Sequence, residues 1–143
     1  MLFVLLGVLS SVFANDIVKE CESFSDHADE LEICTRHALS VGHVIACKKA
    51  RSYRKGGIAC IRSHLSIAQI ESCKPFFAYH SDKSPRIDCF EAERPVNINN
   101  ACAELSIYST VRVACLKNVG NLQEIEVCKK YTTINEQVAC LKK

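Results

Sequence analysis

The chain has 143 residues, of which 48% are hydrophobic, 24% are charged and ten are cysteines. A chain of this length allows one compact domain. Its 18 Lys and Arg residues nearly balance its 16 Asp and Glu residues, and this balance excludes a simple polybasic tail and an acidic linker.

The first 14 residues form an apolar segment without a charged side chain. Its apolar run from Leu2 to Leu9 is far shorter than the ~20 residues that span a bilayer. Small residues at Val12 and Ala14 are typical of the end of a secretory signal peptide. We therefore predict a signal peptide over residues 1–14, cleaved before Asn15, and a mature chain that is secreted or periplasmic and has no integral membrane segment.

Ten cysteines follow at nearly regular intervals. Successive cysteines are 13 residues apart, except for one gap of 16 and a last gap of 12. The residues that flank them alternate between two types, so the repeating unit contains two cysteines and about 26 residues. The cysteines are Cys21, Cys34, Cys47, Cys60, Cys73, Cys89, Cys102, Cys115, Cys128 and Cys140.

Five such units, here called repeats one to five, fill the rest of the chain. Residues that break helices lie between the cysteines, which places each cysteine in the middle of a helix of about nine or ten residues. These breakers are Gly42, Gly56, Gly57, the segment 81–85, Pro95 and Gly120. Each repeat is expected to be a hairpin of two short helices, and the repeats are assigned to residues 15–40, 41–66, 67–96, 97–121 and 122–143.

Apolar residues recur at fixed positions around the first cysteine of each repeat. Positions three before and three after it lie on one helix face, which predicts a buried side. The residues three before are Val18, Val44, Ile70 and Ile125, with Asn99 as the exception, and those three after are Phe24, Ala50, Phe76, Leu105 and Tyr131. A column six after it (His27, Tyr53, Tyr79, Tyr108 and Ile134) is interpreted as core packing.

The second cysteine of each repeat has its own apolar neighbours. The residue after it is Ile61, Phe90, Leu116 or Leu141 in repeats two to five. Repeat one departs from this pattern, with Thr35 at that position and Glu32 two before the cysteine. Such polar substitutions are expected of a repeat that caps the end of an array. The pattern predicts an all-α fold, a short-helix α-solenoid of five disulfide-stapled helical hairpins.

Helices this short are not stable alone in water, because even the best isolated helices need ~12 to 15 residues. In an oxidising compartment disulfides can hold them, and the number of cysteines is even. Pairing within each repeat uses all ten cysteines. A shifted scheme, which begins by joining Cys34 to Cys47, leaves Cys21 and Cys140 free, so counting favours the first scheme and leaves the second open.

Charges are segregated along the chain. Seven acids and one base lie between Asp16 and Glu32, whereas the interval from there to Glu71 contains no acid. Clustered bases could bind a polyanion such as nucleic acid, an acidic polysaccharide or anionic lipid headgroups. The candidate anchors are Lys48, Lys49, Arg51, Arg54 and Lys55. The alternative interpretation is structural: the basic second repeat packs beside the acidic first one.

No motif of an enzyme, a cofactor site or a zinc site is present in the sequence. No two cysteines are closer than 12 positions, which is too wide for a Cys-x(2–4)-Cys zinc motif, and Cu(I) binding would require free thiols. The spacing of the five histidines matches no metal motif. We expect a non-enzymatic binding or scaffold module whose favoured partner is a protein, with polyanion binding as the alternative and end-to-end self-association open.

Overall fold

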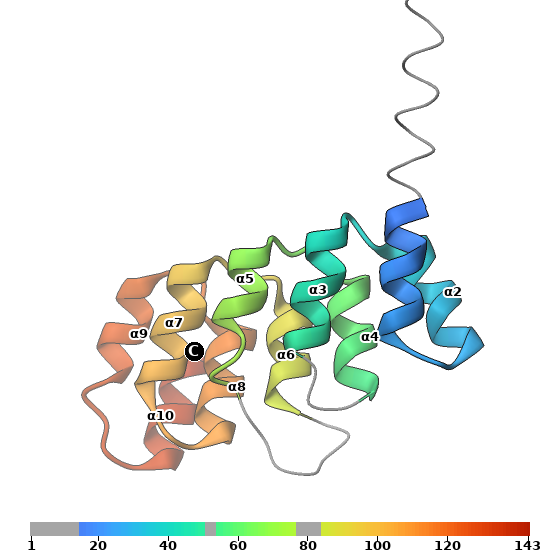
Figure 1. The fold of residues 1–143 in the computed structure, drawn as a ribbon. Helices are drawn as coiled ribbons and strands as arrows, with labels where there is room; N and C mark the ends of the chain where they lie inside the picture. Colours follow the sequence, from blue (N-terminus) through green and yellow to red (C-terminus); the bar gives the residue numbers. More distant parts are fainter. Residues whose placement is uncertain (1–14, 51–53, 77–83) are drawn as a thin grey trace, which may run out of the picture. The chain divides into compact units, whose positions relative to one another are not determined.

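In the computed structural model, residues 15–50, 54–76 and 84–143 are described, and within them all regular structure is helical (Figure 1). The chain divides into two compact units, Met1–His64 and Leu65–Lys143, which are treated separately below. In the described part of the chain, every helix is too short or too polar to span a bilayer. The predicted signal peptide, residues 1–14, lies outside the described residues.

The first unit contains repeats one and two. Residues 15–24 are helical, and they are followed by α2 (Ala28–His37), α3 (Val41–Ala50) and α4 (Arg54–Arg62). Helix α4 packs against both α3 and α2. Each repeat therefore contributes two short helices, and the second helices of the two repeats lie against each other.

The second unit contains three repeats. Its first helices are α5 (Ile67–Ser72), α7 (Val96–Leu105) and α9 (Leu122–Cys128), and its second helices are α6 (Pro85–Ala92), α8 (Ser109–Asn118) and α10 (Ile134–Leu141). Helix α7 packs against α5 and α9, while α8 packs against α6 and α10. Within this unit the first helices form one row and the second helices form another (Figure 1).

The structure has five disulfides, one in each repeat, so the pairing follows the within-repeat scheme. The paired Cα atoms are 5.5 to 5.7 Å apart, which is the ordinary separation for a disulfide between facing helices. The pairs are Cys21–Cys34, Cys47–Cys60, Cys73–Cys89, Cys102–Cys115 and Cys128–Cys140. No free cysteine remains among the ten.

Several helices begin at polar residues that cap the first turn. The hydroxyl of Ser66 accepts from the backbone N–H of Gln69, whose side chain binds back to the N–H of Ser66, so that α5 starts with a capping box. Ser84, Asn121 and Thr133 accept from the first turns of α6, α9 and α10. Such caps satisfy amide groups that have no partner within the helix, which matters for helices of only six to ten residues.

Three of the predicted helix breakers lie inside helices. Gly42 is the second residue of α3, and Gly56 and Gly57 belong to the first turn of α4. The prediction that they separate helices was wrong, because a glycine in a helix costs only about 1 kcal/mol in backbone entropy and packing of the helix can outweigh that. Pro95 and Gly120 do precede helices, at the starts of α7 and α9.

The apolar columns around the cysteines form the core. At the position three before the first cysteine, Val44, Ile70, Asn99 and Ile125 are fully buried, whereas Val18 of repeat one is 40% exposed. The residue after the second cysteine is buried in repeats two to five and exposed as Thr35 in repeat one. The faces that the sequence pattern predicts are therefore the buried ones, and repeat one presents a more polar face.

In the column six residues after the first cysteine, His27 and Tyr108 were wrongly assigned to the core, whereas Ile134, the first residue of α10, is partly buried. His27 and Tyr108 are the N-cap residues of α2 and α8, and both are exposed. The chain turns at this position, between the two helices of a hairpin, so the side chain leaves the packed face. Tyr53 and Tyr79, the other tyrosines of this column, lie outside the described residues.

One structural column was not recognised in the sequence. The residue three before the second cysteine is Arg86, Arg112 or Gln137 in repeats three to five. Each side chain donates to a main-chain oxygen just past the end of the repeat's first helix: Arg86 to Lys74, Arg112 to Ser106 and Gln137 to Tyr131. Carbonyls at a helix end lack partners within the helix, so this column closes the hairpins from inside. Burial also lowers the pKa of Arg86.

Candidate binding surfaces

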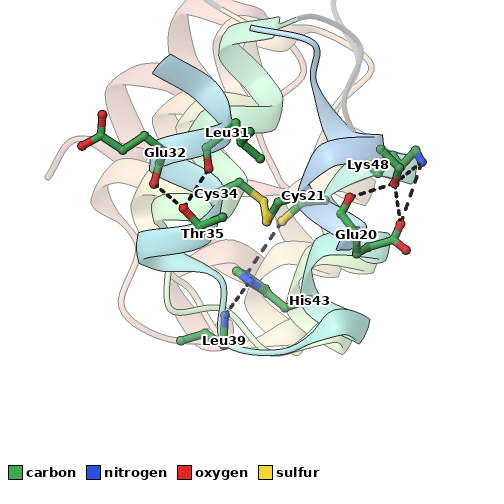
Figure 2. Close-up of a disulfide and its surroundings, with 11 residues drawn as sticks. Glu20, Cys21, Leu31, Glu32, Cys34, Thr35, Leu39, His43 and Lys48 are labelled. Carbon is green, nitrogen blue, oxygen red and sulfur yellow. Dashed lines mark hydrogen bonds and ion pairs between the residues drawn. A yellow bond between two sulfur atoms is a disulfide. The ribbon is translucent and has the colours of Figure 1, made fainter. Parts of the chain in front are cut away.

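The predicted polyanion anchors of repeat two are partly engaged by the acids of repeat one. The Nζ of Lys48 lies 3.8 Å from the Oε1 of Glu20 and donates to the Oγ of Ser23 at 3.0 Å (Figure 2). Arg54 reaches the Oδ1 of Asp29 at 3.0 Å. Its Nε also pairs with Glu30, a carboxylate that is almost completely buried.

The other three anchors are Lys49, Lys55 and Arg51. Lys49 and Lys55 are exposed on α3 and α4, and Arg51 lies outside the described residues. Because Lys48 and Arg54 already face carboxylates, the surface available to a polyanion is less positive than the count of bases suggests. The arrangement favours the structural interpretation, in which the basic second repeat packs on the acidic first one.

His43 is a buried histidine next to the Cys47–Cys60 disulfide of the first unit. Its Nδ1 accepts from the backbone N–H of Leu39 at 3.3 Å (Figure 2), and its Nε2 lies 3.8 Å from the Sγ of Cys47. Burial, with a smaller contribution from the charge of His64, lowers the pKa of His43. The ring is therefore a neutral core residue at pH 7, and its acceptor nitrogen is occupied.

A groove of about 650 Å³ opens on repeat five. Its lining combines side chains of α9 and α10 with the turn before α9. The lining includes Val119, Val127, Tyr131, Leu141, Glu124 and Lys143, together with Cys128 and Cys140. We call this feature the terminal groove. It combines an apolar wall with a charged rim.

The apolar wall of the terminal groove consists of positions that are covered in the other repeats. Tyr131 is 39% exposed, but the equivalent Phe24, Ala50, Phe76 and Leu105 are all buried. Val127 is 49% exposed, whereas the equivalent Ala46 and Ser72 are buried and Ala101 is partly buried. Ser72 accepts from Asn99 of repeat four, so this position helps to pack repeat three on repeat four but is left open on repeat five. The recurrence of the column was visible in the sequence, but its exposure here was not.

The charged rim of the terminal groove has one occupied and one available group. The two carboxylate oxygens of Glu124 accept from the backbone N–H of Gly120 and the side-chain amide of Asn121, both at 2.8 Å. Glu124 thus serves to cap α9. Lys143 is also a lining residue, and its side chain carries a positive charge, so the rim includes a cation.

A smaller hollow of about 200 Å³ lies between α6 and α8. It is spanned by an ion pair in which the Nζ of Lys117 is 2.6 Å from the Oδ1 of Asp88. The hydrogen bond and charge of Asp88 raise the pKa of Lys117. This ion pair joins the second helices of two neighbouring repeats, so the hollow is accounted for by repeat packing.

Among the described residues, no group of three or more His, Cys, Asp or Glu side chains is placed to hold a metal ion. All ten cysteine sulfurs are joined in disulfides and are not available as thiolates. Comparisons with protein-family models, with curated proteins and with solved structures found no match to this chain. Its function is therefore argued from its own surfaces.

Proposed function

We propose that this protein is a secreted, non-enzymatic helical-repeat module that binds another protein through the terminal groove. The observation that carries the proposal is the exposure of Tyr131 at a position that the other four repeats bury, together with the exposed Val127 beside it in the groove lining. Removing exposed apolar side chains from water by covering them with another apolar surface is favourable, so such a face is a candidate binding surface. A tyrosine is well suited to this, because its ring is apolar and its hydroxyl tolerates water.

The proposal includes a solenoid arrangement of the repeats. It is supported in the second unit by the order of helix packing, in which each first helix contacts the next first helix and each second helix the next second helix. In such arrays each repeat is stabilised by its neighbours, and a terminal repeat keeps one face open. The solenoid therefore explains why the groove lies on repeat five.

Secretion is supported by two features. Five disulfides in a small chain are typical of a protein that folds in an oxidising compartment. The uncharged apolar segment of residues 1–14, which ends in small residues, has the composition of a signal peptide.

A binding role is favoured over catalysis by the polar groups of the groove. Both carboxylate oxygens of Glu124 accept hydrogen bonds at the start of α9. This carboxylate is therefore engaged in capping and is poorly placed to act as a general base. The remaining charge, Lys143, can bind an anion. We therefore expect the partner to be a protein segment that places aliphatic or aromatic side chains next to a carboxylate.

The proposal can be tested with anilinonaphthalenesulfonate, a probe that combines apolar rings with an anion. Saturable binding of one probe to the oxidised protein is expected, and Val127→Asp should weaken it at least fivefold because a carboxylate then occupies the apolar wall. The matched control is Ile107→Asp, which places the same charge at an even more exposed apolar residue outside the groove. Equal weakening in both variants, or no binding at all, would contradict the proposal.

The same variants test for self-association. If sedimentation shows a dimer that Val127→Asp dissolves and Ile107→Asp does not, a second copy of this chain occupies the groove and not a different protein. A monomer that binds the probe is the result expected here.

A further inference from the structure

The five disulfides differ in their access to solvent. Eight of the ten cysteines, those of repeats one to four, are 0% exposed, and Cys128 is only 2% exposed. Cys140 is the exception, since it is partly exposed on α10. Cys128 and Cys140 are also the two cysteines that line the terminal groove. One disulfide of the five can therefore be reached from outside without unfolding.

From this geometry we propose that Cys128–Cys140 is a thiol–disulfide exchange site for low-molecular-mass thiols that enter through the terminal groove. Exchange needs a thiolate that approaches one sulfur in line with the S–S bond, so access decides which disulfide reacts. A groove of about 650 Å³ has room for a small thiol beside Cys140. In repeats one to four the packed helices cover both sulfurs.

The exchange proceeds in two steps that balance. A small thiolate attacks the Sγ of Cys140, the S–S bond breaks, and Cys128 leaves as a thiolate. A second small thiolate then attacks the sulfur of the small molecule in the mixed disulfide and releases Cys140 as a thiolate. The protein disulfide is reduced to two thiols, and two molecules of the small thiol are oxidised to their disulfide.

Opening this disulfide frees the shortest hairpin of the second unit. The loop between Cys128 and Cys140 is the shortest of the five, with a separation of 12 residues. Helix α9 has seven residues and α10 has eight, so neither is stable alone. After exchange, α10 is no longer cross-linked to α9 and is held by its packing against α8 and α9. The site can thus loosen the groove that bears it, while the other four disulfides stay closed.

The inference is tested by timed exchange of the full, oxidised chain with 2-mercaptoethanol. Aliquots are quenched with acid, alkylated and analysed by peptide mass spectrometry to give the opening rate of each disulfide. Cys128 and Cys140 should be labelled at least tenfold faster than any other cysteine, and the mixed disulfide should form on Cys140. In denaturant all ten should react at similar rates. Opening of another disulfide first, or of all five together under native conditions, would overturn the proposal.

Two tyrosine variants test whether the groove is the route to the sulfur. Tyr131→Ala enlarges the groove and should raise the exchange rate of Cys128–Cys140 at least threefold. Tyr108→Ala removes an exposed ring that does not line the groove and should leave the rate unchanged. An unchanged rate in Tyr131→Ala would refute the groove as the route. This measurement uses no protein partner, so its failure is distinguishable from failure of the binding proposal.

Discussion

The side-chain amide of Asn99 donates to the hydroxyl of Ser72 at 2.8 Å, linking α7 to α5 in the interior of the second unit. Asn99 occupies a column that is otherwise filled by valine and isoleucine, and it is fully buried. Its Nδ2 lies 3.4 Å from the main-chain oxygen of Arg94, but its Oδ1 has no hydrogen-bond partner. A buried amide of this kind specifies how two repeats pack at some cost in free energy.

Asn99→Val should therefore change the free energy of unfolding by less than about 1 kcal/mol, because it removes a buried oxygen without a partner along with the amide's hydrogen bonds. The hydroxyl of Ser72 still donates to the main-chain oxygen of Gln69 in that variant. Asn99→Ala should cost about 2 kcal/mol, since it loses the same bonds and leaves a cavity. Denaturant unfolding of the oxidised proteins measures both, and a Val variant that loses as much as the Ala variant would show that the amide itself stabilises the interface.

Arg112 is predicted to hold repeats three and four together. Its guanidinium donates to Ser106 of its own repeat and, at 2.8 Å, to the main-chain oxygen of Pro75 in the preceding one. Arg112→Ala leaves both carbonyls without this donor and should lower the free energy of unfolding by about 1 to 3 kcal/mol. The control, Arg36→Ala, removes only an exposed ion pair with Glu32 and should cost less than about 0.5 kcal/mol. Similar losses in the two variants would refute a special role for Arg112.

The buried ring of His43 predicts that acid destabilises the first unit. Burial lowers the pKa of His43 from 6.5 in the folded protein, so the unfolded chain binds a proton at a pH where the folded chain does not. The stabilising contribution is complete above pH 6.5 and is lost as the pH falls from there toward the folded pKa. Unfolding curves between pH 7.5 and 5.5 should show a decline in stability.

Two histidine variants test the source of that decline. His43→Asn keeps an acceptor near the N–H of Leu39 but cannot titrate, so its stability should decline less with acid than that of the unchanged protein. His37→Asn, at an exposed position, should keep the original slope. If the two variants show the same pH dependence, another group is responsible.

Binding of polyanions through repeat two is expected to be weak. Retention on a heparin column should end at low salt, because Lys48 and Arg54 already face carboxylates. Glu20→Gln with Asp29→Asn should remove one facing carboxylate from each base and increase retention, while Arg54 keeps its pair with Glu30. Strong, steeply salt-dependent retention of the unchanged protein would support the polyanion alternative. In that case, changing all five anchors (Lys48, Lys49, Arg51, Arg54 and Lys55) to Gln should abolish it.

The helices and their buried faces were predictable because each repeat places apolar residues at the same positions relative to its cysteines. A column such as Ile61, Phe90 and Leu116 predicts one buried helix face even if single members are ambiguous. Counting favoured the within-repeat disulfide pairing over the shifted scheme, which leaves Cys21 and Cys140 free, and the structure shows the within-repeat pairs. The polar Thr35 of repeat one also indicated a repeat with a more exposed face.

Errors arose where a repeated residue lies at a turn. Tyr108 recurs in register with the repeat, but recurrence identifies only an equivalent position and does not distinguish a core site from the N-cap of a helix. Arg86 and Arg112 were overlooked for a related reason. Their role depends on carbonyl groups at the end of another helix, and those carbonyls lie 6 to 37 residues away in the chain.

The sequence by itself determined the helices and their buried faces, because these depend on spacing along the chain. It favoured the within-repeat cysteine pairs without deciding them. Tertiary structure alone decided which equivalent positions are covered. Tyr131 and Phe76 occupy the same place in the repeat, and Cys140 and Cys115 likewise, yet one member of each pair is exposed and the other is buried. Whether such a residue is buried depends on the repeat that packs over it and not on its own identity. The candidate site could therefore be recognised only from the packed repeats.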